Sequence, residues 1–113
     1  MLPKKNRLNK KEVEFIFKKG KTHKEGFLLL KIIKYKELPY SSFSAVVPKK
    51  ISKKAVERNK IKRRIRESLR KKLSQIQPGF KGIFIALPEI INQDYKIIDK
   101  NINKIIITSK IKK

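Results

Sequence analysis

The sequence predicts an α+β fold, a single-domain α-β sandwich in which helices pack on one sheet. Three short apolar runs, at residues 27–33, 43–47 and 82–87, have the length and flanking turn residues of strands. Three other segments carry apolar residues at helical spacing. A chain of 113 residues buries one hydrophobic core, so residues 1–113 are expected to form one domain.

The first predicted helix runs from Asn9 to Lys19. Val13, Ile16 and Phe17 lie at helical spacing, and Gly20 follows where a helix would end. The run from Phe27 to Ile33 and the run from Phe43 to Val47 are rich in strand-forming residues. Because turn residues at 38–41 separate them, they are predicted to be neighbouring antiparallel strands.

A second helix of about five turns is predicted from about Ser52 to the Pro78-Gly79 pair. Its apolar stripe consists of Val56, Ile61, Ile65, Leu69 and Leu73. Gly82 to Leu87 is predicted to be a strand buried on both faces, because it is a short continuous apolar run. The last predicted helix carries Tyr95, Ile98, Ile102, Ile105 and Ile106 at steps of three and four.

The chain is strongly basic, with 32 Lys and Arg against 9 Asp and Glu and a formal net charge of +23. Such a charge destabilises the compact state by self-repulsion unless a polyanion neutralises it. A merely soluble surface is the alternative, although solubility needs a net charge of only about 2 to 8 on a small domain. The composition therefore favours a nucleic-acid partner.

Several other classes are excluded or disfavoured. The chain has no Cys, which excludes disulfides, Cys-ligated zinc and thiol nucleophiles. No apolar run approaches the ~20 residues that cross a bilayer, and the basic stretch Met1–Lys5 is not followed by the apolar core of a signal peptide. We expect a cytoplasmic protein without a membrane partner.

The charge is densest on the second predicted helix, where residues 53–72 include eleven basic side chains and two acidic ones. Arg58, Lys62, Arg66 and Arg70 recur at steps of four and are predicted to form one row, with Lys60 and Arg64 in a second row. Like charges at this spacing repel, so this helix is suited to a negative surface such as RNA or DNA phosphates. Asn59 is either a local capping residue or a contact to a 2′-hydroxyl or base edge.

No catalytic residue and no protein metal ligand are predicted. The only histidine, His23, lies in a loop-like stretch without an orienting partner in the sequence. Glu12 and Glu14 are two residues apart and therefore point to different sides of a helix. The four glycines are scattered and form no phosphate-binding loop.

The stretch KKISKKAVERNKIKRRIRE, residues 49–67, resembles the signature of the protein subunit of bacterial ribonuclease P. The flanking segments agree: residues 6–8 and 17–21 are similar to the family's opening helix and turn, and residues 83–86 are similar to its late buried strand. Four positions depart from the pattern. They are Pro48 for a serine, Lys60 for an arginine, and Val13 and Leu30 where members of the family carry aromatic residues.

The resemblance implies a central mixed sheet of about four strands with three helices and a left-handed βαβ crossover. It also implies removal of the 5′ leader from precursor tRNA, with the phosphodiester cleaved by an RNA subunit that binds most of the Mg²⁺. The implied partners are that RNA and the leader, with no further protein required. The RNA-subunit contacts would be Lys49, Lys50, Lys53, Arg58, Asn59, Lys60, Lys62, Arg63 and Arg66. The leader contacts would be Phe15, Phe17, Lys21 and Lys31.

Two alternatives remain at this point. A ribosomal or other structural RNA-binding protein would have the same basic composition. An architectural DNA-binding protein is the third reading, although the sequence shows neither a helix-turn-helix pair nor a minor-groove arm.

Overall fold

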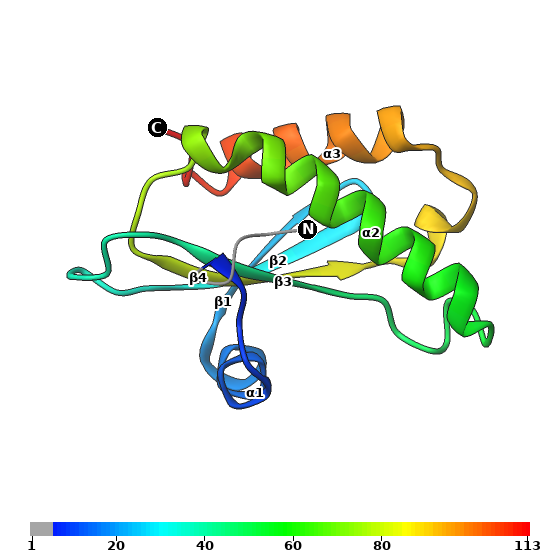
Figure 1. The fold of residues 1–113 in the computed structure, drawn as a ribbon, viewed down its shortest axis with the longest axis horizontal. Coiled ribbons are helices and arrows are strands. Elements are labelled where there is room, and N and C mark those ends of the chain that lie inside the picture. Colours follow the sequence, from blue (N-terminus) through cyan, green and yellow to red (C-terminus); the bar gives the residue numbers. More distant parts are fainter. Residues whose placement is uncertain (1–5) are drawn as a thin grey trace.

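A computed structural model describes residues 6–113 and contains three α-helices and four strands (Figure 1). In chain order the main elements are α1 (Lys10–Lys19), β1 (Lys21–Glu25), β2 (Leu28–Lys34), β3 (Ser42–Val46), α2 (Ala55–Lys72), β4 (Phe80–Ala86) and α3 (Tyr95–Thr108). Short 3₁₀ helices, η2 (Leu73–Gln75) and η3 (Pro88–Asn92), follow α2 and β4. The expectation about Met1–Lys5 lies outside the described residues.

The strands form one mixed sheet in the order β1-β2-β4-β3. β2 is antiparallel to both β1 and β4, and β3 is parallel to β4. The prediction that residues 27–33 and 43–47 are antiparallel neighbours is therefore wrong, because β4 lies between them. β4 buries Ile83 and Ile85 on one face and Phe84 and Ala86 on the other, so the centre of the sheet is where both faces are covered.

β1 is not among the strands predicted from the sequence, and His23, expected in a loop, lies within it. The sequence of β1, KTHKE, has no apolar residue, which is typical of a polar edge strand and hides the alternation that marks other strands. β1 and β2 form a hairpin in which Gly26 adopts a positive φ of 58°. Asn101 of α3 fixes this turn, accepting a hydrogen bond from Phe27 N (3.0 Å) and donating one to Glu25 O (2.8 Å).

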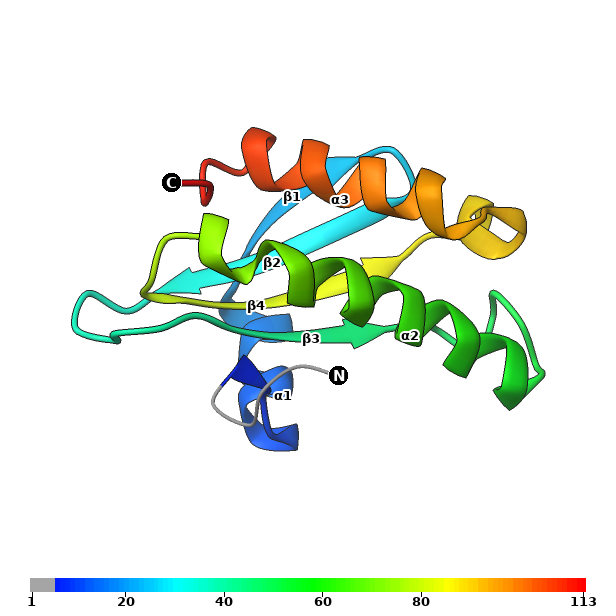
Figure 2. The same ribbon diagram turned by 45° about the horizontal axis from the view of Figure 1, so that its top comes forward.

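The helices cover both faces of the sheet. α2 and α3 lie side by side on one face, and α1 lies alone on the other (Figure 1). The β3-α2-β4 connection joins two adjacent parallel strands. In Figure 2, with α2 in front and both strands pointing right, β4 lies above β3, which is the left-handed sense. The four-stranded mixed sheet, the three helices and the rare left-handed crossover are thus confirmed.

The main core lies between the sheet and the α2–α3 pair. Ile61, Ile65 and Leu69 of α2 pack there with Leu30 and Phe84 of the sheet. The predicted stripe on α2 is wrong at its first residue, because Val56 is 82% exposed. Val56 is in the first turn of α2, which extends past the end of the sheet, so no partner covers it (Figure 1). A smaller core of Ile16, Ile83 and Ile85 lies under α1, with Val13 and Leu29 packed against it.

Side chains at the helix starts and between the helices fix this arrangement. Asn9 caps α1 and forms a capping box with Glu12. Asp94 caps α3 by accepting a hydrogen bond from Ile97 N (3.0 Å). α2 and α3 are joined by an ion pair between Lys72 and Asp99, whose carboxylate also accepts a hydrogen bond from Ser68 Oγ at 2.6 Å.

Candidate nucleic-acid interface

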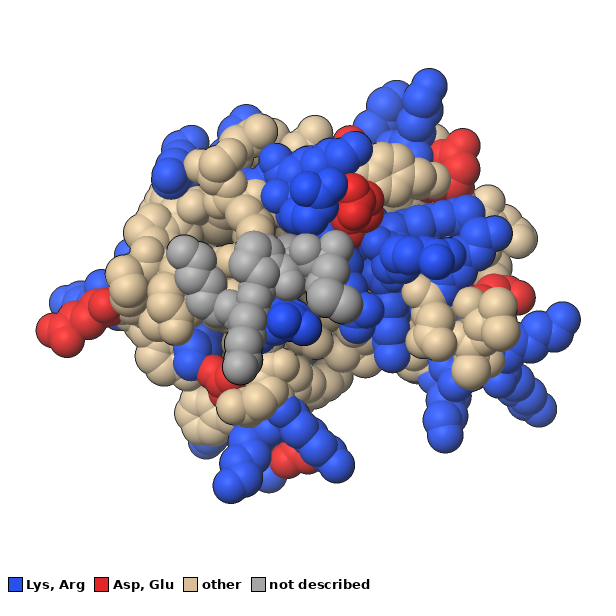
Figure 3. All heavy atoms as spheres, viewed as in Figure 1, with Lys and Arg blue, Asp and Glu red and all other residues tan. Residues whose placement is uncertain are grey.

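The outward face of α2 is predominantly basic. Figure 3 shows Lys and Arg side chains gathered over α2 and projecting from the segment at its N-terminal end. Residues at steps of three and four on this face line an open hollow of about 470 Å³. They are Val56, Asn59, Lys60, Arg63, Arg66 and Glu67. Within residues 6–113 no other helix or strand packs over this face, so its exposed cations can meet an external anion.

Two arginines of the predicted basic rows, Arg58 and Arg64, make internal hydrogen bonds. Arg58 Nη1 donates to Ser52 O at 2.8 Å and so fixes the turn that precedes α2. Arg64 Nη1 donates to Gln93 O at 2.8 Å and ties α2 to the segment before α3. Both side chains are half-buried. Arg58 retains further N–H donors for RNA, whereas Arg64 lies on the flank of α2 that faces α3.

The other cations of the basic run are also of two kinds, those with an internal partner and those that are exposed. Lys72 is buried in its pair with Asp99, so it contributes to packing and not to a surface charge row. Arg70 is exposed and pairs with Glu67, with Nη2 to Oε1 at 2.5 Å. Lys62 is half-buried, and Lys60, Arg63 and Arg66 are exposed. The outward cations therefore do not follow the two rows predicted from the sequence: of those rows only Lys60 and Arg66 line the outward face, together with Asn59 and Arg63.

Asn59 takes part in this face and not in a helix cap. α2 begins at Ala55, with Lys54 as N-cap, so Asn59 is in the second turn and its exposed amide points outward. Lys49, Lys50 and Lys53 are exposed in the turns between β3 and α2. They continue the basic surface beyond the N-terminal end of α2.

A second candidate surface lies on the opposite side of the sheet, at α1. Phe15 is 51% exposed and Phe17 is 39% exposed, and both belong to α1. Lys31 of β2 reaches this helix: its Nζ donates to Phe17 O at 2.8 Å and lies 5.7 Å from the centroid of the Phe17 ring. The structure therefore brings Phe17 and Lys31 together as a cation beside an accessible aromatic ring.

Lys21 does not join this surface. It pairs with Ile32 across the β1–β2 ladder, and Ile32 belongs to the core under α2 and α3. Since paired residues share a face, Lys21 lies on the α3 side of the sheet. Thr22 and Lys24, which pair with Lys31 and Leu29, are the β1 residues on the α1 side. The face that Lys21 occupies follows from the register of β1, a strand that the sequence pattern does not indicate.

Leu30 and Val13, two departures from the family pattern, both pack in hydrophobic cores. Leu30 is fully buried in the core under α2 and α3, on the face opposite α1, so an aromatic ring at this position would not meet a ligand on the α1 side. Val13 packs against the small core under α1. The accessible rings on α1 itself are those of Phe15 and Phe17.

An ion pair fixes α1 on the sheet. Lys81 of β4 contacts the carboxylate of Glu12, and its hydrogen bond holds the pKa of Glu12 below the ordinary value of 4.5 and raises the pKa of Lys81. Lys81 Nζ also lies 5.2 Å from the centroid of the Tyr35 ring. Among residues 6–113, no three side chains of the metal-ligating types His, Cys, Asp and Glu come together as a metal site.

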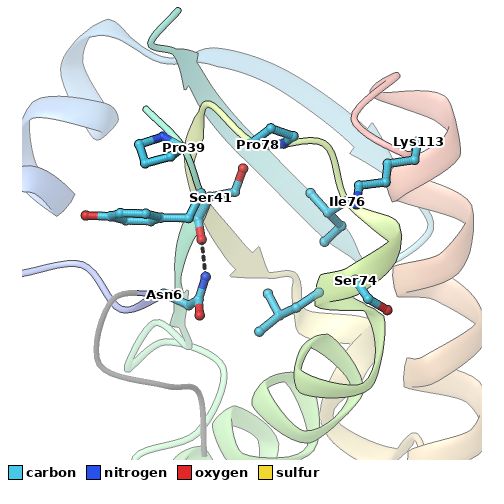
Figure 4. Close-up of a pocket in the computed structure, with 9 residues that line it drawn as sticks. Asn6, Pro39, Ser41, Ser74, Ile76, Pro78 and Lys113 are labelled. Atoms are coloured by element: carbon cyan, nitrogen blue, oxygen red, sulfur yellow. Dashed lines mark hydrogen bonds between the residues drawn. The ribbon is translucent and has the colours of Figure 1, made fainter. Parts of the chain in front are cut away.

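Another hollow, of about 310 Å³, lies where η2 meets the segment before β3 (Figure 4). Asn6 Nδ2 donates to Ser41 O at 2.6 Å on its wall. Ser41 Oγ donates to Gln77 O at 2.7 Å and accepts a hydrogen bond from Phe80 N at 3.0 Å. Asn6, which the sequence indicates only through the family resemblance, thus anchors the chain to the segment that leads into β3.

Comparisons with known proteins agree with this geometry. The family model described as Ribonuclease P matches residues 2–110. The ribonuclease P protein component of Synechocystis sp. is 35% identical over 96 residues, covering 84% of this chain and 77% of the relative. That of Pseudanabaena sp. is 32% identical over 113 residues, covering 98% and 97%.

Solved structures show the same fold. A Staphylococcus aureus RNase P protein mutant with defective mRNA degradation activity superposes with a TM-score of 0.85 at 28% identity, covering 96% of this chain and 91% of that chain. The RNase P protein of Thermotoga maritima gives a TM-score of 0.77 at 27% identity, covering 87% and 92%. The outward basic face of α2, the left-handed crossover and these matches lead to one assignment: the chain belongs to the ribonuclease P protein family, the protein components of an endoribonuclease.

Proposed function

We propose that this chain is the RNA-binding subunit of a ribonuclease P that removes the 5′ leader from precursor tRNA. In this proposal, the outward face of α2 binds the RNA subunit and the α1 face holds the single-stranded leader. The observation that carries it is the one-sided basic face of α2, where Lys60, Arg63 and Arg66 are exposed around a hollow while the helix packs through its opposite side.

The physical basis of the RNA contact is neutralisation of phosphate charge. Each phosphate that meets a lysine or arginine releases condensed counterions, which favours binding at low salt. Arg63 and Arg66 can grip phosphate oxygens through two N–H groups, and Lys60 acts as a point charge. Asn59 lies among them and can donate to and accept from a 2′-hydroxyl, which distinguishes RNA from DNA.

The α1 face is suited to a leader of variable sequence. Every base has a π-face, so stacking on an aromatic ring tolerates any base. The accessible rings of Phe15 and Phe17 supply such platforms, and Lys31 supplies a cation beside Phe17 for the strand's backbone. Contacts of this kind hold a strand without selecting its sequence.

The reaction in this proposal is hydrolysis of one phosphodiester, which leaves a 5′-phosphate on the mature tRNA. The RNA subunit and its Mg²⁺ ions supply the bond cleavage, and no step runs through a protein-bound metal. The protein's part is to lower the repulsion between two polyanions and to hold the leader in place. A cytoplasmic location belongs to the proposal, because both RNAs are made there.

The test is reconstitution with the cognate catalytic RNA. We expect the protein to lower the magnesium concentration needed for cleavage and to favour precursors with a leader over leaderless ones. A variant with Arg63→Gln and Arg66→Gln removes two outward charges, leaves the packed side of α2 intact, and should weaken binding of the catalytic RNA. If the wild-type protein changes neither the magnesium requirement nor the leader preference, the proposed function is wrong.

A further inference from the structure

A second basic hollow lies where β1 and the ends of β2 and α3 meet, at the left-hand end of the molecule in Figure 2. Its volume is about 370 Å³. We call it the β1–α3 hollow. Its lining residues are Lys21, His23, Ile32, Lys34, Phe80, Thr108, Ser109 and Lys110, and none of them is acidic. Neither the α2 face nor the α1 face includes these residues.

The strand register explains why these side chains share one hollow. Lys21 pairs with Ile32 and Lys34 pairs with Phe80, and both partners belong to the core under α2 and α3. Lys21, Lys34 and Phe80 therefore lie on the α3 side of the sheet. Lys34 Nζ is 5.8 Å from the centroid of the buried Phe80 ring. Two lysines from different strands thus line the same concave surface.

Lys110 adds a third cation in a conformation that is unfavourable for it. Its φ is 63°, and among residues 6–113 it is the only non-glycine residue with a positive φ. Glycine or asparagine is the usual residue for this left-handed position after a helix. A cation near the last carbonyls of α3 is favourable, but that interaction is weak at an exposed site. A lysine here is explained better when its charge also meets a ligand.

The β1–α3 hollow lies close to the α1 face, around the edge of the sheet. β1 is the outermost strand on its side. Within it, Lys21 lines the hollow, while the next residue, Thr22, pairs with Lys31 on the α1 side. An RNA strand that passes Phe17 and Lys31 and rounds the edge at β1 therefore arrives at this hollow.

We propose that a backbone phosphate of the 5′ leader binds in the β1–α3 hollow, between Lys21, Lys34 and Lys110. This inference rests on the proposed function, in which the leader crosses the α1 face. Ammonium groups bind a phosphate without reading bases, so the contact extends the leader site while keeping its tolerance of sequence. A leader too short to round β1 would not use the hollow.

The test compares precursors that differ only in leader length, bound to the reconstituted holoenzyme in Ca²⁺ to suppress cleavage. The test variant carries Lys34→Gln and Lys110→Asn, and asparagine is chosen because it tolerates a positive φ. The matched control carries Lys96→Gln and Lys100→Gln, which remove two exposed charges from α3 outside the hollow. Thermal unfolding of both variants checks that they fold.

With short leaders, we expect the test variant to bind like the wild-type protein. With longer leaders, it should bind about threefold to tenfold more weakly for each lysine that no longer meets a phosphate. Because the hollow holds one phosphate, the slope of log K against log salt should fall by at most about 0.7 with the longer leaders. The control variant should show no such dependence on leader length.

Three outcomes separate the possibilities. Equal affinity of the test variant and the wild-type protein at every leader length would overturn the inference. An equal loss at every length, leaderless precursor included, would assign the hollow to another RNA segment and would also overturn it. If the wild-type holoenzyme itself gains no affinity from any leader, the proposed leader site fails, and that result is distinct from the first two.

Discussion

Two arginines that are two positions apart on α2 provide a direct test of which side of the helix binds RNA. Arg64 and Arg66 carry the same charge, and the substitutions Arg64→Ala and Arg66→Ala change the net charge equally. They differ in their contacts: Arg64 Nη1 donates to Gln93 O at 2.8 Å, whereas Arg66 is exposed and lines the outward hollow. Arg64→Ala is therefore expected to affect stability, and Arg66→Ala to affect binding.

The expected size of the stability effect follows from the Arg64 hydrogen bond. A charge-assisted hydrogen bond contributes about 1.5–3 kcal/mol when buried, and the half-buried position of Arg64 reduces this to about 1 kcal/mol. In a protein of this size, a loss of about 1 kcal/mol in the free energy of unfolding lowers Tm by about 4–6 °C. Arg66→Ala removes an exposed side chain and should change stability by less than about 0.5 kcal/mol. Thermal unfolding followed by circular dichroism measures both.

The binding effect is expected in the reverse order. If Arg66 neutralises one phosphate of the RNA subunit, Arg66→Ala should reduce the slope of log K against log salt by about 0.9, while Arg64→Ala should leave the slope near that of the wild-type protein. Binding to the catalytic RNA at several salt concentrations gives these slopes. An equal loss of slope in both variants, with Arg64→Ala as stable as the wild-type protein, would refute the assignment of Arg64 to packing and Arg66 to RNA.

Four further outcomes are expected. Ile65→Ala, at a fully buried position between α2 and the sheet, should lower the free energy of unfolding by about 2–5 kcal/mol in denaturant titrations. Asp99→Asn should destabilise the fold by about 2–3 kcal/mol at pH 7, because it leaves Lys72 buried without its ion-pair partner. Burial raises the pKa of Asp99, but hydrogen bonds from Lys72 and Ser68 outweigh this effect and hold the pKa below 3.8. The stabilisation from ionised Asp99 is therefore present at neutral pH and is lost as pH falls below about 3.8. Asp99→Asn should flatten that part of the acid-unfolding curve. Phe17→Ala should weaken binding of leader-bearing precursor by about 1–3 kcal/mol and leave leaderless precursor unchanged, and equal losses for the two substrates would contradict a stacking role. Glu12→Gln, which leaves Lys81 without its carboxylate, should weaken the attachment of α1 and speed hydrogen exchange in α1 before the rest of the protein.

The helices and the strongly apolar strands could be predicted from the sequence because their patterns are local. The spacing of Ile61, Ile65 and Leu69 predicts a helix whatever it packs against, and Asn9 and Gly20 mark the ends of α1 correctly. The basic run on α2 likewise predicts a polyanion partner from charge alone. β1 could not be predicted for the converse reason, because an edge strand with polar residues on both sides carries no period-2 signal.

The internal hydrogen bond of Arg64 could not be predicted, because it joins segments far apart in the chain. Charge and spacing do not separate Arg64 from Arg66, and although the family resemblance names only Arg66 as an RNA contact, the partner of Arg64 is Gln93, 29 residues away. Val56 fits the helical period but lies beyond the sheet, so periodicity placed it in the core wrongly. A signal for Arg64 would have been its position next to Ile61 and Ile65, toward the packed side of the helix.

The sequence by itself determined the charge, the helices, the apolar strands and, through residues 49–67, the family. Only the tertiary structure decided which strands pair with one another, which face of the sheet each side chain occupies, and which cations make internal hydrogen bonds. The physical reason is that periodicity and charge belong to neighbouring residues. The pairing of β4 between β2 and β3 and the opposite placements of Lys21 and Lys31, by contrast, depend on contacts between segments far apart in the chain.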